Sequence, residues 1–156
     1  MTEQLSPLAL QALAVVKESG AIIGANHAHP HTIRHKGRID LVTETDIAVE
    51  AFLKERLATL APQAGFLAEE SAEDLSLPDT CWIIDPVDGT TNFAHGLPLT
   101  VTSVAYRLNG EIVLGIVNAP LLRECFIAEK GKGAWRNGER ISVSSVTACE
   151  NALVAT

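Results

Sequence analysis

Residues 81–92, CWIIDPVDGTTN, place a short apolar run directly before two aspartates that are three positions apart. The run Cys81–Ile84 is bounded by prolines and is typical of a buried strand. Because Pro86 fixes one backbone angle between Asp85 and Asp88, a tight turn can direct both carboxylates into one small volume. The stretch therefore predicts a strand that ends in a cation-binding turn.

The residues after the second aspartate favour an anion next to that cation. Gly89 permits close approach of the backbone, and a helix that opens at Thr90 would present free N–H groups to an anion. Carboxylate and carbonyl oxygens suit Mg²⁺, which is often bound together with phosphate. A plain Asp-Gly-Thr turn without a ligand is the alternative, because turn chemistry alone explains these residue types.

A second acidic pair, Glu69-Glu70, follows another short apolar run at residues 65–68. If the two predicted strands are neighbours, their acidic ends meet at one edge of a sheet. Carboxylates about 4 Å apart repel by roughly 1 kcal/mol in water and by about 4 kcal/mol at an effective dielectric of 20. A cluster at this edge would therefore imply a bound metal, whereas a solvated surface pair is the alternative.

The N-terminal part of the chain predicts two helices. Ser6-Pro7 is typical of an N-cap and a first turn, and apolar residues then recur at three- and four-residue spacing to about Gly24. Residues 25–39 show no period and predict a mobile loop. The segment Thr43–Asp46 has capping-box spacing, so we expect a second helix that begins at Asp46 and ends before Pro62.

The second half of the chain predicts hairpins. Asn109-Gly110 separates two β-rich runs between Val101 and Val117, and Asn137-Gly138 marks another tight turn, between Trp135 and Ile141. Helices followed by hairpins favour an α+β fold, with two helices packed on a mainly antiparallel sheet. Residues 142–151 are predicted to be a polar connector, and residues 152–156 to be the beginning of a further strand.

The composition predicts a folded, acidic domain. The chain has 156 residues, a net charge of −7 and 47% apolar residues. Its basic residues form no run, which counts against nucleic-acid binding. We expect no membrane association, because no apolar run of 18 residues is evident and the N-terminus has no basic start before an apolar stretch. Three widely spaced cysteines favour a reducing, cytoplasmic location.

Three motifs together resemble one family. They are Asp40-Leu41-Val42-Thr43 with Asp46, then Glu69-Glu70-Ser71, then residues 82–93, WIIDPVDGTTNF. Their order and spacing resemble those of the inositol monophosphatase family, which are magnesium-dependent, lithium-sensitive phosphatases. The resemblance runs from the first helix to the end of the chain. It implies the first half of an αβαβα fold, with residues 1–150 as a metal-binding domain and 151–156 as the start of an absent C-terminal α/β half.

The resemblance also implies roles for individual residues. Two or three Mg²⁺ ions would be held by Glu69, Asp85, the carbonyl of Val87 and Asp88, with Asp85 bridging two of the ions. Asp46 and Thr90 would orient and help deprotonate the attacking water. The implied catalytic residues are Asp46, Glu69 and Thr90. Phosphate would be bound by Gly89 and Thr90. Lys36 and Glu70 are further candidates near the site.

Two classes of function remain open at this stage. The first is a magnesium-dependent phosphomonoesterase that hydrolyses inositol 1-phosphate or a related small phosphate ester and works as a homodimer. This chain would then be a weakly active or inactive fragment of that enzyme. Sugar bisphosphates, adenosine 3′,5′-bisphosphate and histidinol phosphate are alternative substrates within that class. The second is a non-catalytic module that binds metal or a partner through an unfinished sheet edge.

Overall fold

The computed structural model describes residues 5–27, 33–35, 41–69 and 77–153. Within these residues two long helices and a short one accompany a two-stranded and a seven-stranded sheet. The helices and strands, in chain order, are α1 (Pro7–Asn26), β1 (Ile33–His35), β2 (Leu41–Thr43), α2 (Glu44–Leu60), β3 (Gly65–Ala68), β4 (Cys81–Asp88), α3 (Thr90–Ala94), β5 (Val101–Leu108), β6 (Glu111–Ala119), η1 (Pro120–Leu122), β7 (Glu124–Glu129), β8 (Gly133–Arg136), β9 (Glu139–Ile141) and η2 (Cys149–Asn151).

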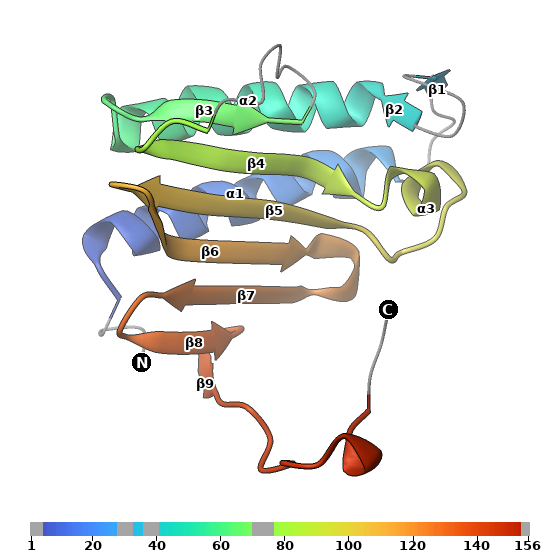
Figure 1. The fold of residues 1–156 in the computed structure, drawn as a ribbon. Helices are drawn as coiled ribbons and strands as arrows, with labels where there is room; N and C mark the ends of the chain where they lie inside the picture. The colour runs from blue at the N-terminus through green and yellow to red at the C-terminus, as the bar shows by residue number, and fades with distance from the viewer. Residues whose placement is uncertain (1–4, 28–32, 36–40, 70–76, 154–156) are drawn as a thin grey trace.

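The large sheet has the order β3-β4-β5-β6-β7-β8-β9. Only the β3–β4 pair is parallel, and the other neighbours in this sheet are antiparallel. Both long helices pack against each other and against the same face of the sheet, the far face in Figure 1. The predicted α+β class, with two helices on a mainly antiparallel sheet, is therefore confirmed.

The core lies between the helices and the sheet. Along β5, alternate residues are buried, and Val104 and Tyr106 face the helices. The ring of Tyr106 lies 4.5 Å from that of Trp82 on the neighbouring strand, and Trp82 is fully buried. These large side chains fix the register of β4 against β5, since a slip of one residue would move them to the other face.

The first helix begins as expected and continues slightly farther than expected. Ser6 is its N-cap, and the Ser6 Oγ accepts a hydrogen bond from the Ala9 N–H. The helix ends at Asn26 instead of near Gly24. By length and mean hydropathy, 20 residues and 1.4, this helix could cross a membrane, contrary to the expectation that the chain has no such apolar stretch. Its apolar residues, among them Val16 and Ile23, form part of the core, as is typical of a helix packed on a sheet.

The second helix begins two residues earlier than predicted. Thr43 is its N-cap, and Asp46 occupies the third helical position of a complete capping box. The prediction treated Asp46 as the first residue, whereas the capping-box geometry requires the cap to lie three residues before the acidic side chain. The helix ends at Leu60, before Pro62, as expected.

Two predictions about irregular segments were wrong in part. Ile33–His35, inside the predicted loop 25–39, form strand β1, which pairs antiparallel with β2. At the other end of the chain, the predicted connector contains the short helix η2, and Ala152 and Leu153 belong to no strand. Residues 154–156, the rest of that predicted strand, lie outside the described residues. Very short elements and element boundaries are the least reliable predictions from a single sequence.

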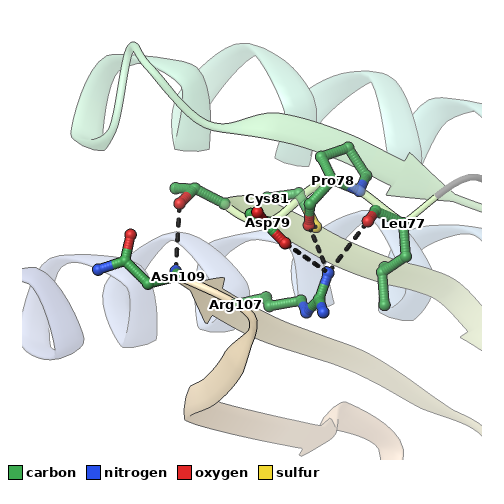
Figure 2. Close-up of polar contacts among 7 residues, drawn as sticks. Leu77, Pro78, Asp79, Cys81, Arg107 and Asn109 are labelled. Carbon is green, nitrogen blue, oxygen red and sulfur yellow. Dashed lines mark hydrogen bonds and ion pairs between the residues drawn. The ribbon is translucent and has the colours of Figure 1, made fainter.

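The start of β4 is held by the neighbouring strand. Figure 2 shows the Arg107 guanidinium directed at the segment that leads into β4. Its Nη1 donates hydrogen bonds to the carbonyls of Leu77, at 3.0 Å, and Pro78, at 2.7 Å. The Asn109-Gly110 turn joins β5 to β6 as predicted, and its Gly110 N–H donates to the carbonyl of Asp79. The beginning of β4 is thereby fixed, at the end of the strand opposite Asp85 and Asp88.

Candidate functional site

Parallel pairing places two carboxylates side by side. Ala68 on β3 is the partner of Ile84 on β4, and the Glu69 N–H donates to the Ile84 carbonyl at 3.1 Å. This bond continues the ladder by one residue, so Glu69 comes next to Asp85. The C-terminal ends of β3 and β4, the start of α2 and α3 all lie at one end of the molecule (Figure 1).

A bulge in β4 separates the two aspartates of the motif. Asp85 pairs with Ser103 of β5, but Asp88 pairs with Val101, so β4 has one residue more than β5 over this interval. Pro86 has no N–H for the ladder, and both Pro86 and Val87 are buried, which breaks the alternation of the strand. The bulge is the local reason that Asp85 and Asp88 both reach one cavity.

Gly89 turns the chain from β4 into α3. Its φ of +90° lies in the left-handed region, and a Cβ at this position would lie 2.8 Å from the Leu99 carbonyl oxygen. The Phe93 N–H donates to the Gly89 carbonyl, and the Phe93 ring is fully buried. A glycine is thus required here by backbone angle and by space, and Phe93 anchors the short helix that follows.

The first turn of α2 meets this helix through one carboxylate. The Oδ2 of Asp46 accepts hydrogen bonds from the backbone N–H and the hydroxyl of Thr43. The Oδ1 of Asp46 accepts a hydrogen bond from the Thr90 hydroxyl at 3.0 Å. The Thr90 Oγ1 also lies 2.9 Å from the Val87 carbonyl, and its single proton can serve one of these acceptors at a time.

These segments enclose a cavity of about 240 Å³. The described residues that line it are Glu69, Asp85, Val87, Asp88, Gly89, Thr90, Thr91 and Asn92. They supply acidic, hydroxyl, amide and backbone groups, and this described lining contains no Lys, Arg or His side chain.

The Asp85 carboxyl is affected both by burial and by the neighbouring carboxylates. Burial, together with the negative charges of Glu69, Asp88 and Asp46, raises the pKa of the Asp85 carboxyl from its ordinary value near 3.8 to about 7, burial being the largest cause. The Asp85 Oδ1 is buried and has no hydrogen-bond partner among the residues that the structure describes. A proton or a cation is therefore needed to offset the charge at neutral pH.

The donor set fits a hard divalent cation. It offers carboxylate oxygens, a buried Asp85 oxygen that has no partner within the described ranges, and the carbonyl of Val87 nearby. In the part of the chain that the structure describes, however, no three Asp, Glu, His or Cys side chains are gathered into a ready-made metal cluster. Mg²⁺ fits this arrangement, because it usually takes only one or two carboxylates and keeps waters or phosphate oxygens as its other ligands.

Six of the residues predicted from the sequence line this one cavity, and they are Glu69, Asp85, Val87, Asp88, Gly89 and Thr90. Asp46 does not appear in that described lining and is connected to it by the hydrogen bond from the Thr90 hydroxyl. Lys36, Asp40 and Glu70 lie outside the described residues.

Sequence reasoning assigned no role to Thr91 and Asn92, which also line the cavity. Their place directly after Thr90 in the motif was the available signal. The contribution of Thr43 as a donor to Asp46 could have been read from the capping-box spacing.

Comparison with known proteins gives the same family as the motifs. A protein named inositol monophosphatase from Dictyostelium discoideum is 46% identical over 149 residues, which are 93% of this chain and 55% of that protein. The chain therefore spans about half the length of the curated relatives that it matches.

Solved structures share the fold. The extragenic suppressor protein suhB from Bartonella henselae superposes with a TM-score of 0.84 at 33% identity, over 90% of this chain and 56% of that one. An inositol monophosphatase/NADP phosphatase complexed with Mg²⁺ and phosphate superposes with a TM-score of 0.73 at 28% identity, over 81% and 49% of the two chains. The sequence model of the inositol monophosphatase family matches residues 4–156, and the chain belongs to that family.

Proposed function

We propose that this chain supplies the metal- and phosphate-binding part of a magnesium-dependent phosphomonoesterase that acts on inositol 1-phosphate or a related small phosphate ester. One observation carries the proposal. The carboxylates of Glu69, Asp85 and Asp88 share a single cavity with Gly89 and Thr90, where a helix begins. Cation ligands and anion-binding N–H groups thus lie next to each other, as hydrolysis of a phosphate ester requires.

The metal ligands in this proposal are Glu69, Asp85, Asp88 and the carbonyl of Val87. Two ions, when bound, would neutralise charge on the phosphate and lower the pKa of the attacking water. A relative with the same fold, whose structure contains Mg²⁺ and phosphate, supports this choice of ion. Asp85 has the central place, because its carboxyl is the most deeply buried of the three.

Phosphate would be held by the backbone at the start of α3. The first N–H groups of a helix have no partner inside the helix, and at Gly89 and Thr90 they border the cavity. The left-handed conformation of Gly89 sets the direction of these groups. Phosphate oxygens can therefore bind to the backbone without help from a basic side chain of the described lining.

Asp46 and Thr90 would position the attacking water. When the Thr90 hydroxyl donates its proton to Asp46 Oδ1, the lone pairs of Thr90 Oγ1 are available to accept a hydrogen bond from water. Asp46 itself is held by Thr43 and is 1% exposed, so its orientation is fixed. A proton from the water can then be transferred towards Thr90 and Asp46 as the bond to phosphorus forms.

The test measures Mg²⁺ binding by residues 1–156 and phosphate release from inositol 1-phosphate. Release is measured with this chain and, where the reading frame continues, with the full protein. We expect Mg²⁺ binding by the chain, Mg²⁺-dependent release by the full protein and weak or no release by the chain. We also expect Asp85→Asn to abolish both binding and release. Undiminished release after this substitution, or the absence of Mg²⁺ binding, would contradict the proposal.

The same assay distinguishes the alternatives. A panel of fructose bisphosphate, adenosine 3′,5′-bisphosphate and histidinol phosphate would identify the ester, and inositol 1-phosphate is expected to be cleaved fastest. Mg²⁺ binding without release of phosphate from any of them would favour a non-catalytic metal-binding module.

We also propose that the protein works in the cytoplasm as a homodimer. The three cysteines are unpaired, which supports a reducing compartment. Analytical ultracentrifugation tests the dimer, and sedimentation as a monomer at micromolar concentration would contradict it.

A further inference from the structure

The bulge in β4 interrupts the regular pairing with β5. Between the pairs Asp85–Ser103 and Asp88–Val101 the register shifts by one residue. Carbonyl groups that lose their ladder partner need another donor, because a buried carbonyl without one costs free energy. Two threonine hydroxyls, one directly before β5 and one within it, donate hydrogen bonds to carbonyls of the bulged segment.

The two hydroxyls bind on either side of Val87. Thr102 Oγ1 donates to the Pro86 carbonyl at 2.9 Å, and Thr100 Oγ1 donates to the Asp88 carbonyl at 3.1 Å. Thr102 is 0% exposed and Thr100 is 1% exposed, so water cannot easily replace either hydroxyl. The backbone is therefore anchored immediately before and immediately after Val87.

The two hydrogen bonds hold the segment that carries the proposed metal ligands. The segment that the threonines hold contains the Val87 carbonyl, and the aspartates Asp85 and Asp88 lie at its two ends. Mg²⁺ tolerates little departure from octahedral geometry, so a bulge free to shift would weaken its binding. Removal of a group that hydrogen-bonds to a metal ligand and orients it typically lowers metal affinity by about 10- to 100-fold.

We propose that Thr100 and Thr102 are positioning residues, which hold the bulged segment Asp85–Asp88 in the geometry that binds Mg²⁺. This inference rests on the proposed function, because it concerns the same metal site. Neither threonine lines the cavity, so each would act only through the backbone that it holds.

A purely structural role for these threonines is the competing explanation, and a matched control separates the two. Ser19 is also 0% exposed, and its Oγ donates to the Val16 carbonyl at 2.8 Å within α1. Ser19 does not line the cavity. Ser19→Ala therefore removes an equally buried hydroxyl-to-carbonyl hydrogen bond without touching the bulge.

The experiment compares the wild-type chain with Thr102→Val, Thr100→Val, Thr102→Ser and Ser19→Ala. Titration calorimetry gives the Kd for Mg²⁺, and thermal unfolding gives the stability of each variant. We expect Thr102→Val to weaken Mg²⁺ binding by about 10-fold or more, and Thr100→Val to weaken it in the same direction. Thr102→Ser keeps the hydroxyl and is expected to bind nearly as the wild type does. Ser19→Ala is expected to lower the Tm without changing the Kd.

Unchanged Mg²⁺ affinity in both valine variants, with the wild type binding normally, would overturn this inference and leave the proposed function standing. Equal weakening by Ser19→Ala would overturn it as well, since the effect would then follow from lost stability alone. If the wild-type chain binds no Mg²⁺, both this inference and the proposed function are wrong. If Thr102→Val does not fold, Thr100→Val and Thr102→Ser decide the question.

Discussion

Thr90 Oγ1 lies 3.0 Å from Asp46 Oδ1, and this hydrogen bond joins residues that are 44 positions apart in the chain. It connects the first residue of α3 to the first turn of α2. The two helices begin at the same end of the sheet, where β3 and β4 end (Figure 1). The hydrogen bond thereby joins two of the three motifs at the candidate site.

Asp46→Asn is expected to lower kcat of the full protein by about 10²- to 10⁴-fold, the usual contribution of a general acid–base group. The asparagine can still accept hydrogen bonds from Thr43, so α2 should remain capped. Steady-state kinetics at saturating Mg²⁺ measures the effect. Glu55→Gln removes an exposed carboxylate elsewhere on α2 and serves as the control. If both variants retain full kcat, Asp46 has no part in proton transfer.

The stability of the metal-free chain should fall as the pH rises from about 4 to about 7. The pKa of Asp85 is raised from near 3.8 to about 7 in the folded chain, mainly by burial, so over this range the folded state binds more protons than the unfolded state. The free energy of unfolding therefore decreases with rising pH. Thermal unfolding in the presence of a chelator measures this slope.

Two further measurements test the origin of that pH dependence. Asp85→Asn carries no titrating carboxyl at this position and should show a flatter profile. Saturating Mg²⁺ should also remove the loss of stability near pH 7, because the cation then offsets the charge in place of the proton. An identical slope in the wild type and in Asp85→Asn would assign the effect to other groups.

Gly89→Ala should destabilise the chain by about 1–3 kcal/mol, the usual cost of a strained backbone conformation. The new Cβ would meet the Leu99 carbonyl oxygen at 2.8 Å, and the φ of +90° is unfavourable for alanine. Chemical denaturation measures the change, and Mg²⁺ affinity should fall with it as the turn after Asp88 shifts.

Gly24→Ala is the matched control for that substitution. Gly24 lies inside α1, and a Cβ there would have no neighbour within 4 Å. Alanine should stabilise this helix by up to about 1 kcal/mol. A destabilisation of the same size in both variants would show that the turn has no special requirement for glycine.

Arg107→Met should lower the free energy of unfolding by about 1.5–3 kcal/mol, the usual range for hydrogen bonds from a charged group. The guanidinium holds the carbonyls of Leu77 and Pro78, as Figure 2 shows, and methionine cannot donate to them. Mg²⁺ affinity should not change, because these contacts lie at the end of β4 opposite the aspartates.

Arg56→Met is the control for Arg107→Met. Arg56 forms an exposed ion pair with Glu18 at 3.1 Å, and such pairs contribute about 0–1 kcal/mol. The Tm of Arg56→Met should stay close to that of the wild type. A change in Mg²⁺ affinity in Arg107→Met would mean that the two ends of β4 are coupled.

Much of the fold could be predicted because its signals are local. Ser6-Pro7 and the capping box at Thr43 mark the starts of helices, and Asn109-Gly110 marks a tight turn. Each signal depends on backbone angles or hydrogen bonds within a few residues. Strand β1 was missed because three residues carry too little pattern to indicate a strand, and its pairing with β2 is a tertiary contact.

The chemistry of the candidate site can be recognised from the amino-acid order alone: the acidic residues Glu69, Asp85 and Asp88, and the glycine at 89. Their geometry depends on how distant segments pack. The register of β3 against β4 places Glu69 beside Asp85, and Thr100 and Thr102 donate hydrogen bonds to carbonyls of the segment that bulges against β5. The raised pKa of Asp85 likewise depends on burial and on carboxylates from other segments. Pairing, bulging and burial all arise from contacts between residues far apart in sequence, and a local pattern carries no information on such contacts.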